Sequence, residues 1–244
     1  MQSGETILTN AAMEPEIEDL QNFLNKMGAK IEGAGTNVIK IIGVKNLKDI
    51  SYNIMPDRIE AGTMLCMAAA TSGNLELNNV IPEHITPVIK KLEECGCKFN
   101  IKKNSISMEA PKKLKCVDIK TMPYPGFPTD MQSVFTSMVC IAKGTSVVVE
   151  NIFENRFKYT NELKRMGEKI SIEGKIAIVK GVRKLSSATV EATDLRGGAA
   201  VVLAGLVAKG KTTVKNIEYI LRGYEKLDVK LKSLGADIYI EEKE

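Results

Sequence analysis

The stretch TDLRGGAAVVLAGLVAKG, residues 193–210, decides the fold of this chain. It opens close to an aspartate, continues through a helical run that is apolar nearly all round (199–208), and closes at Gly210. A helix without a polar face has to be buried on every side. The stretch therefore predicts a helix at the centre of a layered fold rather than on its surface.

The same succession occurs two more times in the 244 residues. The three apolar runs lie at 64–70, 134–142 and 199–208. An aspartate stands before each run, namely Asp57, Asp130 and Asp194. A glycine suited to a left-handed C-terminal cap follows each run, namely Gly73, Gly144 and Gly210. Internal repetition of this kind predicts one structural unit used three times.

Each run leads into the same second half of the unit. A short strand-like segment is followed by an asparagine, at Asn79, Asn151 and Asn216. An amphipathic helix comes next, clearest where one helical face carries Leu227, Leu231 and Leu234. A glycine ends this helix in every unit, at Gly96, Gly167 and Gly235, and alternating strands such as 170–179 follow. The unit is therefore predicted to be β-α-β-α-β-β.

A fourth copy is present only in part. Residues 4–10 repeat the spacing from glycine to asparagine, residues 17–27 form an amphipathic helix, and Gly28 ends it. The buried helix that should precede Gly4 has no counterpart, so we expect further sequence upstream. We predict a half-unit at 1–55, joined through 44–56 to a lobe at 56–244 with repeats at about 56–122, 123–187 and 188–244. The incomplete unit should expose apolar surface and sheet edges, which favours association with a missing lobe or self-association.

Composition narrows the class of protein. With 44% hydrophobic and 26% charged residues, the chain has the make-up of a folded soluble domain. The excess of 34 Lys and Arg over 30 Asp and Glu is too small to indicate a nucleic-acid partner, but it suits anionic small molecules. No apolar run reaches the length of a membrane span, no signal peptide is visible, and the five cysteines are typical of reduced thiols. We expect a cytoplasmic protein without a membrane partner.

The three aspartates allow two interpretations. An aspartate before a helix commonly caps it by accepting a backbone N–H. Equivalent helices in a repeated array would also bring their N-termini together, and converging N-termini favour an anion. Asp130 beside Thr129, and Asp194 beside Arg196, would then border a polyanion site.

Two arginines stand where amphipathic helices are predicted to start, Arg156 in the second unit and Arg222 in the third. An exposed arginine at such a position usually forms a weak surface ion pair. Its guanidinium can equally form a fork for phosphate or carboxylate. Spacing alone does not decide between these interpretations.

No metal site is predicted. Cys95 and Cys97 lack a second ligand pair, and His84 is the one histidine of the chain. His84 also lacks a Ser or Cys partner in any recognisable motif, so packing in a loop explains it better. The glycines after Arg196 match neither a phosphate-binding loop nor a dinucleotide fingerprint, and no organic cofactor is expected.

Six ordered segments together closely resemble the UDP-N-acetylglucosamine 1-carboxyvinyltransferase family of enolpyruvyl transferases. They are NAAMEPEI (10–17), PDRIEAGT (56–63), FPTDMQ (127–132), ENRF (154–157), ATDLR (192–196) and RGYE (222–225). Each is weak alone, but the ordered set is specific, and the resemblance covers essentially the whole chain. The segments are not those of the shikimate-pathway enolpyruvyl transferases, and no basic, aromatic-interleaved face indicates the related RNA 3′-phosphate cyclases.

The resemblance implies an α/β fold of the inside-out barrel type, in which two lobes of three repeats close over substrates, here incomplete at the N-terminus. It implies transfer of the enolpyruvyl group of phosphoenolpyruvate to the 3-hydroxyl of UDP-N-acetylglucosamine with release of phosphate. This reaction opens peptidoglycan synthesis and so serves cell-wall biogenesis, cell shape, cell division and the cell cycle. Such chemistry needs a base for the sugar hydroxyl, an acid for the methylene carbon, and cations for phosphate and carboxylate.

The matching segments also imply roles for single residues. Asp130 would be the base at the sugar hydroxyl and a ligand of the sugar. Ile152 and Arg156 would contact the nucleotide sugar. The remaining matched residues would bind phosphoenolpyruvate or line its cleft, namely Arg196, Arg222, Asp194 and Leu195. The resemblance implies no metal and no organic cofactor.

The departure from the family is large. The family's catalytic cysteine loop and further contacts to phosphoenolpyruvate belong to a lobe that this chain lacks. None of the cysteines lies in that motif, whether Cys66, Cys95, Cys97, Cys116 or Cys140. The chain alone is therefore expected to be inactive. Alternatively, it is a catalytically incomplete lobe or inactive paralogue that acts as a binding or interaction protein.

Overall fold

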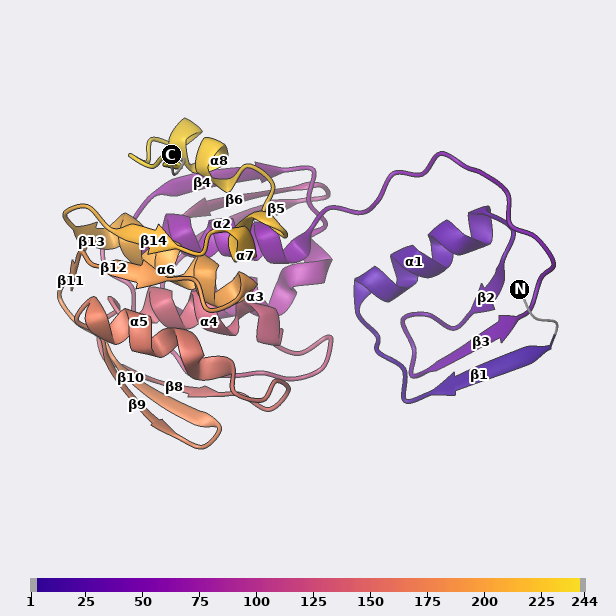
Figure 1. The fold of residues 1–244 in the computed structure, drawn as a ribbon, viewed down its shortest axis with the longest axis horizontal. Helices are drawn as coiled ribbons and strands as arrows, with labels where there is room; N and C mark the ends of the chain where they lie inside the picture. Colours follow the sequence, from indigo (N-terminus) through magenta and orange to yellow (C-terminus); the bar gives the residue numbers. More distant parts are fainter. Residues whose placement is uncertain (1–3, 242–244) are drawn as a thin grey trace.

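Three helices form the centre of the fold, and sheets lie around them (Figure 1). The computed structural model describes residues 4–241, so the outer ends of the predicted divisions, 1–3 and 242–244, lie outside it. The central helices are α2 (Arg58–Ala70), α4 (Thr129–Val139) and α6 (Leu195–Val207), and most of their residues are buried. Their apolar runs thus lie at the centre, as the sequence predicts. Ser137 Oγ of α4 donates to the carbonyl of Ala200 in α6 (2.8 Å), so this buried hydroxyl is satisfied.

Groups of three antiparallel strands repeat one strand order along the chain. In each group the last strand in sequence lies between the other two; the first two groups are complete sheets, and the third is part of a four-stranded sheet. The groups are β1 (Glu5–Thr9), β3 (Val38–Ile42) and β2 (Lys30–Glu32); β4 (Asn74–Asn78), β6 (Ser105–Glu109) and β5 (Lys98–Lys102); and β8 (Thr145–Val149), β10 (Ile176–Lys180) and β9 (Lys169–Glu173). The repeat seen in the sequence is therefore a repeat of structure.

The amphipathic helices end as predicted. They are α1 (Pro15–Lys26), η1 with α3 (Pro82–Ile85, Thr86–Glu94), η2 with α5 (Arg156–Tyr159, Thr160–Arg165), and α7 and α8 (Glu218–Leu221, Leu227–Ser233). A glycine follows each with φ between +96° and +105°, at Gly28, Gly96, Gly167 and Gly235. This left-handed conformation is the one that glycine adopts without strain, so four equivalent glycines end four equivalent helices.

The third unit differs from the prediction. Short parallel pairs flank α6, with β11 (Leu185–Ser186) beside β13 (Ala208–Lys209) and β12 (Thr189–Glu191) beside β14 (Thr213–Lys215). In the described part of the chain no antiparallel hairpin follows α8, and Leu234 is exposed beyond that helix. The complete β-α-β-α-β-β succession occurs in the second unit, where β7 (Ile119–Lys120) runs parallel to β8.

The central helices do not end at the predicted glycine caps. After α2 the left-handed position belongs to Ser72 (φ +55°) rather than Gly73. Gly144 and Gly210 have positive φ, but both lie beyond their helices. The carbonyl of Cys140 at the end of α4 accepts instead from the amide of Val182 (2.7 Å), and α6 passes directly into β13. Pairing with other segments thus replaces local caps at these two ends.

The N-terminal half-unit lies beside the main body, and residues 43–57, which join the two, contain no helix or strand (Figure 1). An ion pair between Arg58 Nε and Glu16 Oε1 (2.8 Å) connects α1 to the start of α2. Every residue of β1 is exposed, including Ile7 and Leu8. This sheet therefore exposes apolar side chains to solvent. Within residues 4–241, no helix has the length and apolar character needed to cross a membrane.

Candidate functional site

Two of the three repeat-opening aspartates are helix caps. Asp57 accepts hydrogen bonds from the amides of Ile59 (2.7 Å) and Glu60 (2.9 Å) at the start of α2. Asp194 accepts from the amides of Arg196 (2.9 Å) and Gly197 (2.8 Å) at the start of α6. Both carboxylates satisfy N–H groups that the helix itself leaves free, so the capping interpretation holds for these two.

Asp130 differs from the other two. It is the second residue of α4, whose N-cap is Pro128, and its side chain caps nothing. Its Oδ1 accepts from Nη2 of Arg156 (3.0 Å) and from Nε of Arg196 (3.1 Å). The side chain is 41% exposed, and Oδ2 accepts no hydrogen bond from residues 4–241. One oxygen is thus fixed by two guanidiniums while the other is free to meet a ligand.

Arg156 is held on several sides. Its side chain is only 7% exposed, so the interpretation as a solvated surface ion pair is wrong for this residue. Nη2 also donates to the carbonyl of Thr129 (3.2 Å), and the guanidinium lies 4.6 Å from the ring centre of Phe153. Arg156 begins η2, as predicted, directly after Asn155 in the left-handed region. A desolvated guanidinium beside a carboxylate is a stronger and more directional partner than an exposed one.

Arg196 joins the third unit to this cluster. Its Nη1 donates to the hydroxyl of Tyr224 (3.3 Å), and that buried hydroxyl shares a hydrogen bond with Oγ1 of Thr63 in α2 (3.0 Å). Side chains from all three units therefore meet around Asp130. The first turns of α4 and α6 meet here through the hydrogen bond between Arg196 and Asp130.

Arg222 lies near Tyr224 in the sequence, but its side chain is not part of the cluster around Asp130. It is the C-cap of α7 rather than the first residue of the last helix, because the chain still has to turn before α8. The neighbouring Gly223 packs under Leu195, where a Cβ would lie 2.8 Å from Leu195 Cδ2. This close approach places the Arg222 loop against the start of α6. Arg222 is exposed, stacks near Tyr219 (5.9 Å), and forms no ion pair within the described residues.

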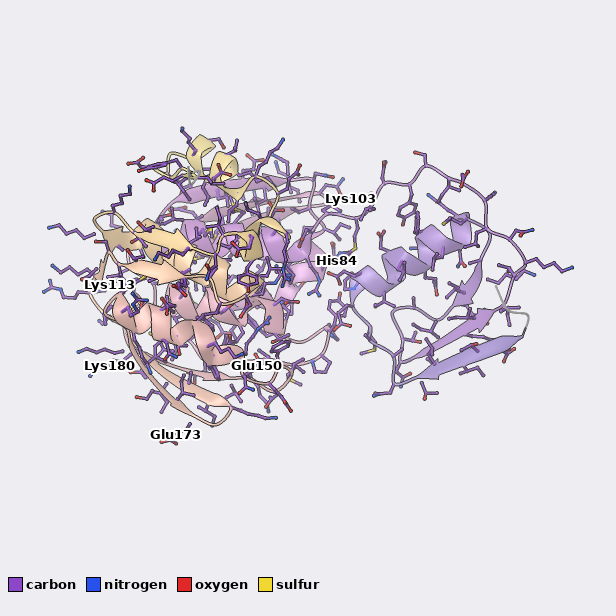
Figure 2. The ribbon with its side chains drawn as sticks, in the orientation of Figure 1. His84, Lys103, Lys113, Glu150, Glu173 and Lys180 are labelled. Carbon is purple, nitrogen blue, oxygen red and sulfur yellow. The ribbon has the colours of Figure 1, made fainter. Side chains whose placement is uncertain are left out.

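Ile152 lies in an exposed loop after β8. Its amide donates to Glu150, a residue that the sequence does not single out. The amides of Ile152 (2.8 Å) and Phe153 (2.9 Å) both donate to Oε1 of Glu150. Glu150 is 2% exposed, although most glutamates lie on the surface. Figure 2 labels it on the main body. An acidic residue between an apolar strand and Asn151 is the only signal in the sequence, and it does not reveal burial.

The cysteines and the histidine supply no second site. Burial raises the pKa of Cys95 to about 12 and that of Cys97 to about 11, so these thiols are poor nucleophiles at neutral pH. No cluster of His, Cys, Asp or Glu between residues 4 and 241 could hold a metal ion. His84 lies between the main body and α1 (Figure 2), and burial lowers its pKa. Its Nδ1 is buried and has no hydrogen-bond partner among the described residues.

Comparisons with known proteins agree with this architecture. The family profile of EPSP synthase (3-phosphoshikimate 1-carboxyvinyltransferase) matches residues 1–242. A UDP-N-acetylglucosamine 1-carboxyvinyltransferase 1 of Caldanaerobacter subterraneus subsp. tengcongensis is 56% identical over 97% of this chain and 57% of its own length. The UDP-N-acetylglucosamine 1-carboxyvinyltransferase of Trichlorobacter lovleyi is 52% identical over 96% of this chain and 56% of its own length. The chain thus spans a little over half the length of these relatives.

Solved structures share the fold. The enolpyruvyl transferase NikO from Streptomyces tendae superposes with a TM-score of 0.85 at 27% identity, over 97% of this chain and 56% of that protein. An EPSP synthase from Acinetobacter baumannii, at 20% identity and a TM-score of 0.74, shares the fold over 98% of this chain and 58% of its own. The repeated units, their central helices and these matches lead to one conclusion: the chain belongs to the EPSP synthase family of enolpyruvyl transferases.

Proposed function

We propose that this chain is part of a protein that transfers the enolpyruvyl group of phosphoenolpyruvate to the 3-hydroxyl of UDP-N-acetylglucosamine and releases phosphate. The observation that carries the proposal is the Asp130 carboxylate, with Oδ1 fixed by Arg156 and Arg196 and Oδ2 free. The names of relatives at 52% and 56% identity support the choice of acceptor. The reaction would serve peptidoglycan synthesis in the cytoplasm, and through it cell-wall biogenesis, cell shape and cell division.

In this proposal Asp130 takes the proton of the sugar hydroxyl through Oδ2. A fixed carboxylate is an effective base because it is already oriented toward the proton that it removes. Ile152 and Arg156 contact the nucleotide sugar from the loop after β8. The exposed guanidinium of Arg222, unpaired within the described residues, binds phosphoenolpyruvate together with Arg196, beside Asp194 and Leu195.

The proposal includes a division of the chain. Residues 1–55 form the last half-repeat of one lobe, and residues 56–244 form the three repeats of another. No cysteine of this chain matches the family's catalytic loop, so the chain by itself is proposed to be inactive. The open surface of β1 would then meet either the remainder of the first lobe or a second copy.

The test is to find which acceptor substrate supports the release of phosphate from phosphoenolpyruvate. The protein that carries this chain is incubated with phosphoenolpyruvate and either UDP-N-acetylglucosamine or 3-phosphoshikimate, and released phosphate and the mass of the product are measured. We expect phosphate and an enolpyruvyl adduct with the sugar nucleotide alone. Turnover with 3-phosphoshikimate instead, or with neither acceptor, would reject the proposal. Residues 1–244 alone, assayed in parallel, should release no phosphate.

A further inference from the structure

Glu150 is a buried carboxylate surrounded by hydrogen-bond donors. Its Oε1 accepts from Oγ1 of Thr121 (2.8 Å) as well as from the amides of Ile152 and Phe153. Its Oε2 accepts from Oγ1 of Thr129 (3.0 Å). Within the described residues it forms no ion pair. Four donors therefore satisfy a charge that lies away from solvent.

The chemistry of these partners requires an acceptor at Oε1. Two of the partners are backbone amides, which can only donate, and they share Oε1 with a threonine hydroxyl. A glutamine in this position would keep a carbonyl oxygen for these three donors and turn its NH2 group toward Thr129, whose hydroxyl can accept as well as donate. The shape would be retained, but the three hydrogen bonds to Oε1 would lose the contribution of the negative charge.

The two oxygens of Glu150 reach two different parts of the candidate site. Oε1 holds the loop that carries Ile152 and Phe153. Oε2 holds Thr129, the residue before Asp130 at the start of α4. The same loop returns to Asp130 through Arg156, whose guanidinium lies over the Phe153 ring. Glu150 thus fixes the distance between the exposed loop and the carboxylate.

We propose that Glu150 is a positioning residue that sets the affinity for the sugar nucleotide by holding the Ile152–Phe153 loop against Asp130. The inference rests on the proposed function, because it takes the loop and Asp130 as the surface that binds the sugar nucleotide. Arg222, assigned to phosphoenolpyruvate, is not among the hydrogen-bond partners of Glu150 in the described part of the chain. Loss of the tether should therefore affect one substrate and spare the other.

The experiment measures both KM values for Glu150→Gln in the protein that carries this chain. Because three hydrogen bonds to Oε1 become hydrogen bonds to a neutral acceptor, KM for UDP-N-acetylglucosamine should rise by about tenfold. KM for phosphoenolpyruvate should change by less than about twofold. The matched control is Glu168→Gln, since Glu168 is a buried glutamate of the same unit without a hydrogen bond to this loop, and it should leave both KM values unchanged. An equal rise in both KM values for Glu150→Gln, or none, would overturn the inference.

A single-bond variant covers the case in which Glu150→Gln does not fold. Thr129→Val removes the hydroxyl that donates to Oε2, and Thr129→Ser keeps it. We expect Thr129→Val to lower kcat/KM for the sugar nucleotide severalfold and Thr129→Ser to restore it. If serine does not restore what valine loses, the tether to α4 has no role in binding.

Hydrogen exchange separates this inference from the proposed function. In Glu150→Gln the amides of Ile152 and Phe153 should exchange faster in the chain itself, without any substrate. Faster exchange without turnover of the sugar nucleotide by the wild type would uphold the tether and reject the assigned substrate. Unchanged exchange of both amides would reject the tether.

Discussion

The first and second units are built from the same elements, but of the two only the second provides the carboxylate of the candidate site. Each has a central helix, α2 or α4, and three antiparallel strands in the same order. In the first unit Asp57 is the N-cap of α2, whereas in the second Pro128 is the N-cap and Asp130 is the second residue of α4. The carboxylate of the candidate site is therefore found where one copy departs from the repeat.

The largest expected effect follows from this pair of aspartates. Asp130→Asn, in the protein that carries this chain, should lower kcat by about 10³-fold, because an amide cannot take a proton and a positioned base contributes about 10²–10⁴-fold. Asp57→Asn is the matched control, and it should keep full turnover because asparagine caps a helix as well as aspartate. Steady-state kinetics on both variants measures the difference in kcat. Similar turnover in the two would erase the distinction between the units.

The second unit offers another contrast, between two buried glutamates. Glu150 has four donors, whereas within residues 4–241 neither oxygen of Glu168 accepts a hydrogen bond. Burial raises the pKa of Glu168 to about 7, and the neighbouring Cys140 offsets this only in part. A carboxyl whose pKa is higher in the folded state binds its proton more tightly there, so stability falls as pH rises from about 4.5 to about 7 and stays low above that.

Glu168→Gln should therefore stabilise the chain at pH 8 by about 3 kcal/mol, the equivalent of the pKa shift. The difference from wild type should shrink toward zero well below pH 4.5, where the carboxyl is neutral in both states. Urea unfolding at several pH values measures this. A gain that does not vary with pH would mean that packing, not ionisation, determines the effect.

A smaller effect should come from the cap itself. Asp57→Ala removes the acceptor for the amides of Ile59 and Glu60 and should lower the free energy of unfolding by about 1 kcal/mol. Turnover should be unaffected, because within the described residues Asp57 forms no hydrogen bond or ion pair with Asp130, Arg156 or Arg196. Thermal or urea unfolding together with a rate assay checks both parts. A loss of turnover with intact stability would place Asp57 in the site.

The repeated architecture could be predicted from the sequence because it depends on burial. A run such as 199–208 has no polar face, and Gly28, Gly96 and Gly167 recur at matching positions, so central helices and their surrounding elements follow directly. The helix ends could not be predicted in the same way. The carbonyl of Cys140 is satisfied by Val182, some 40 residues further on, and such a long-range partner leaves no local pattern.

Residues of the candidate site could be predicted only where the type of side chain itself indicates a chemical role. Asp130 and Arg156 stand out because acidic and basic side chains near helix starts suggest an anion site, and the structure joins them. Glu150 did not stand out, because only the fold brings Thr121 and Thr129 to its oxygens. A buried charge is recognised by its partners, which lie in other segments of the chain.

The smallest expected effect concerns the left-handed residue after α2. Ser72 holds φ +55°, where the equivalent position after an amphipathic helix is glycine. An L-residue in this conformation costs about 1 kcal/mol, part of which is offset because glycine loses more entropy on folding. Ser72→Gly should therefore raise the free energy of unfolding by about 0.5 kcal/mol.

The reverse substitution, glycine to serine, can be made at the end of a helix that glycine caps. At Gly167, φ is +96° and no atom would lie within 4 Å of an added Cβ, so Gly167→Ser introduces backbone strain without a clash. It should destabilise the chain by about 1 kcal/mol, with the urea m-value unchanged in both variants. If both substitutions shift the urea midpoint in the same direction, backbone conformation does not explain why serine stands at 72 and glycine at 167. The two helix ends would then not be equivalent.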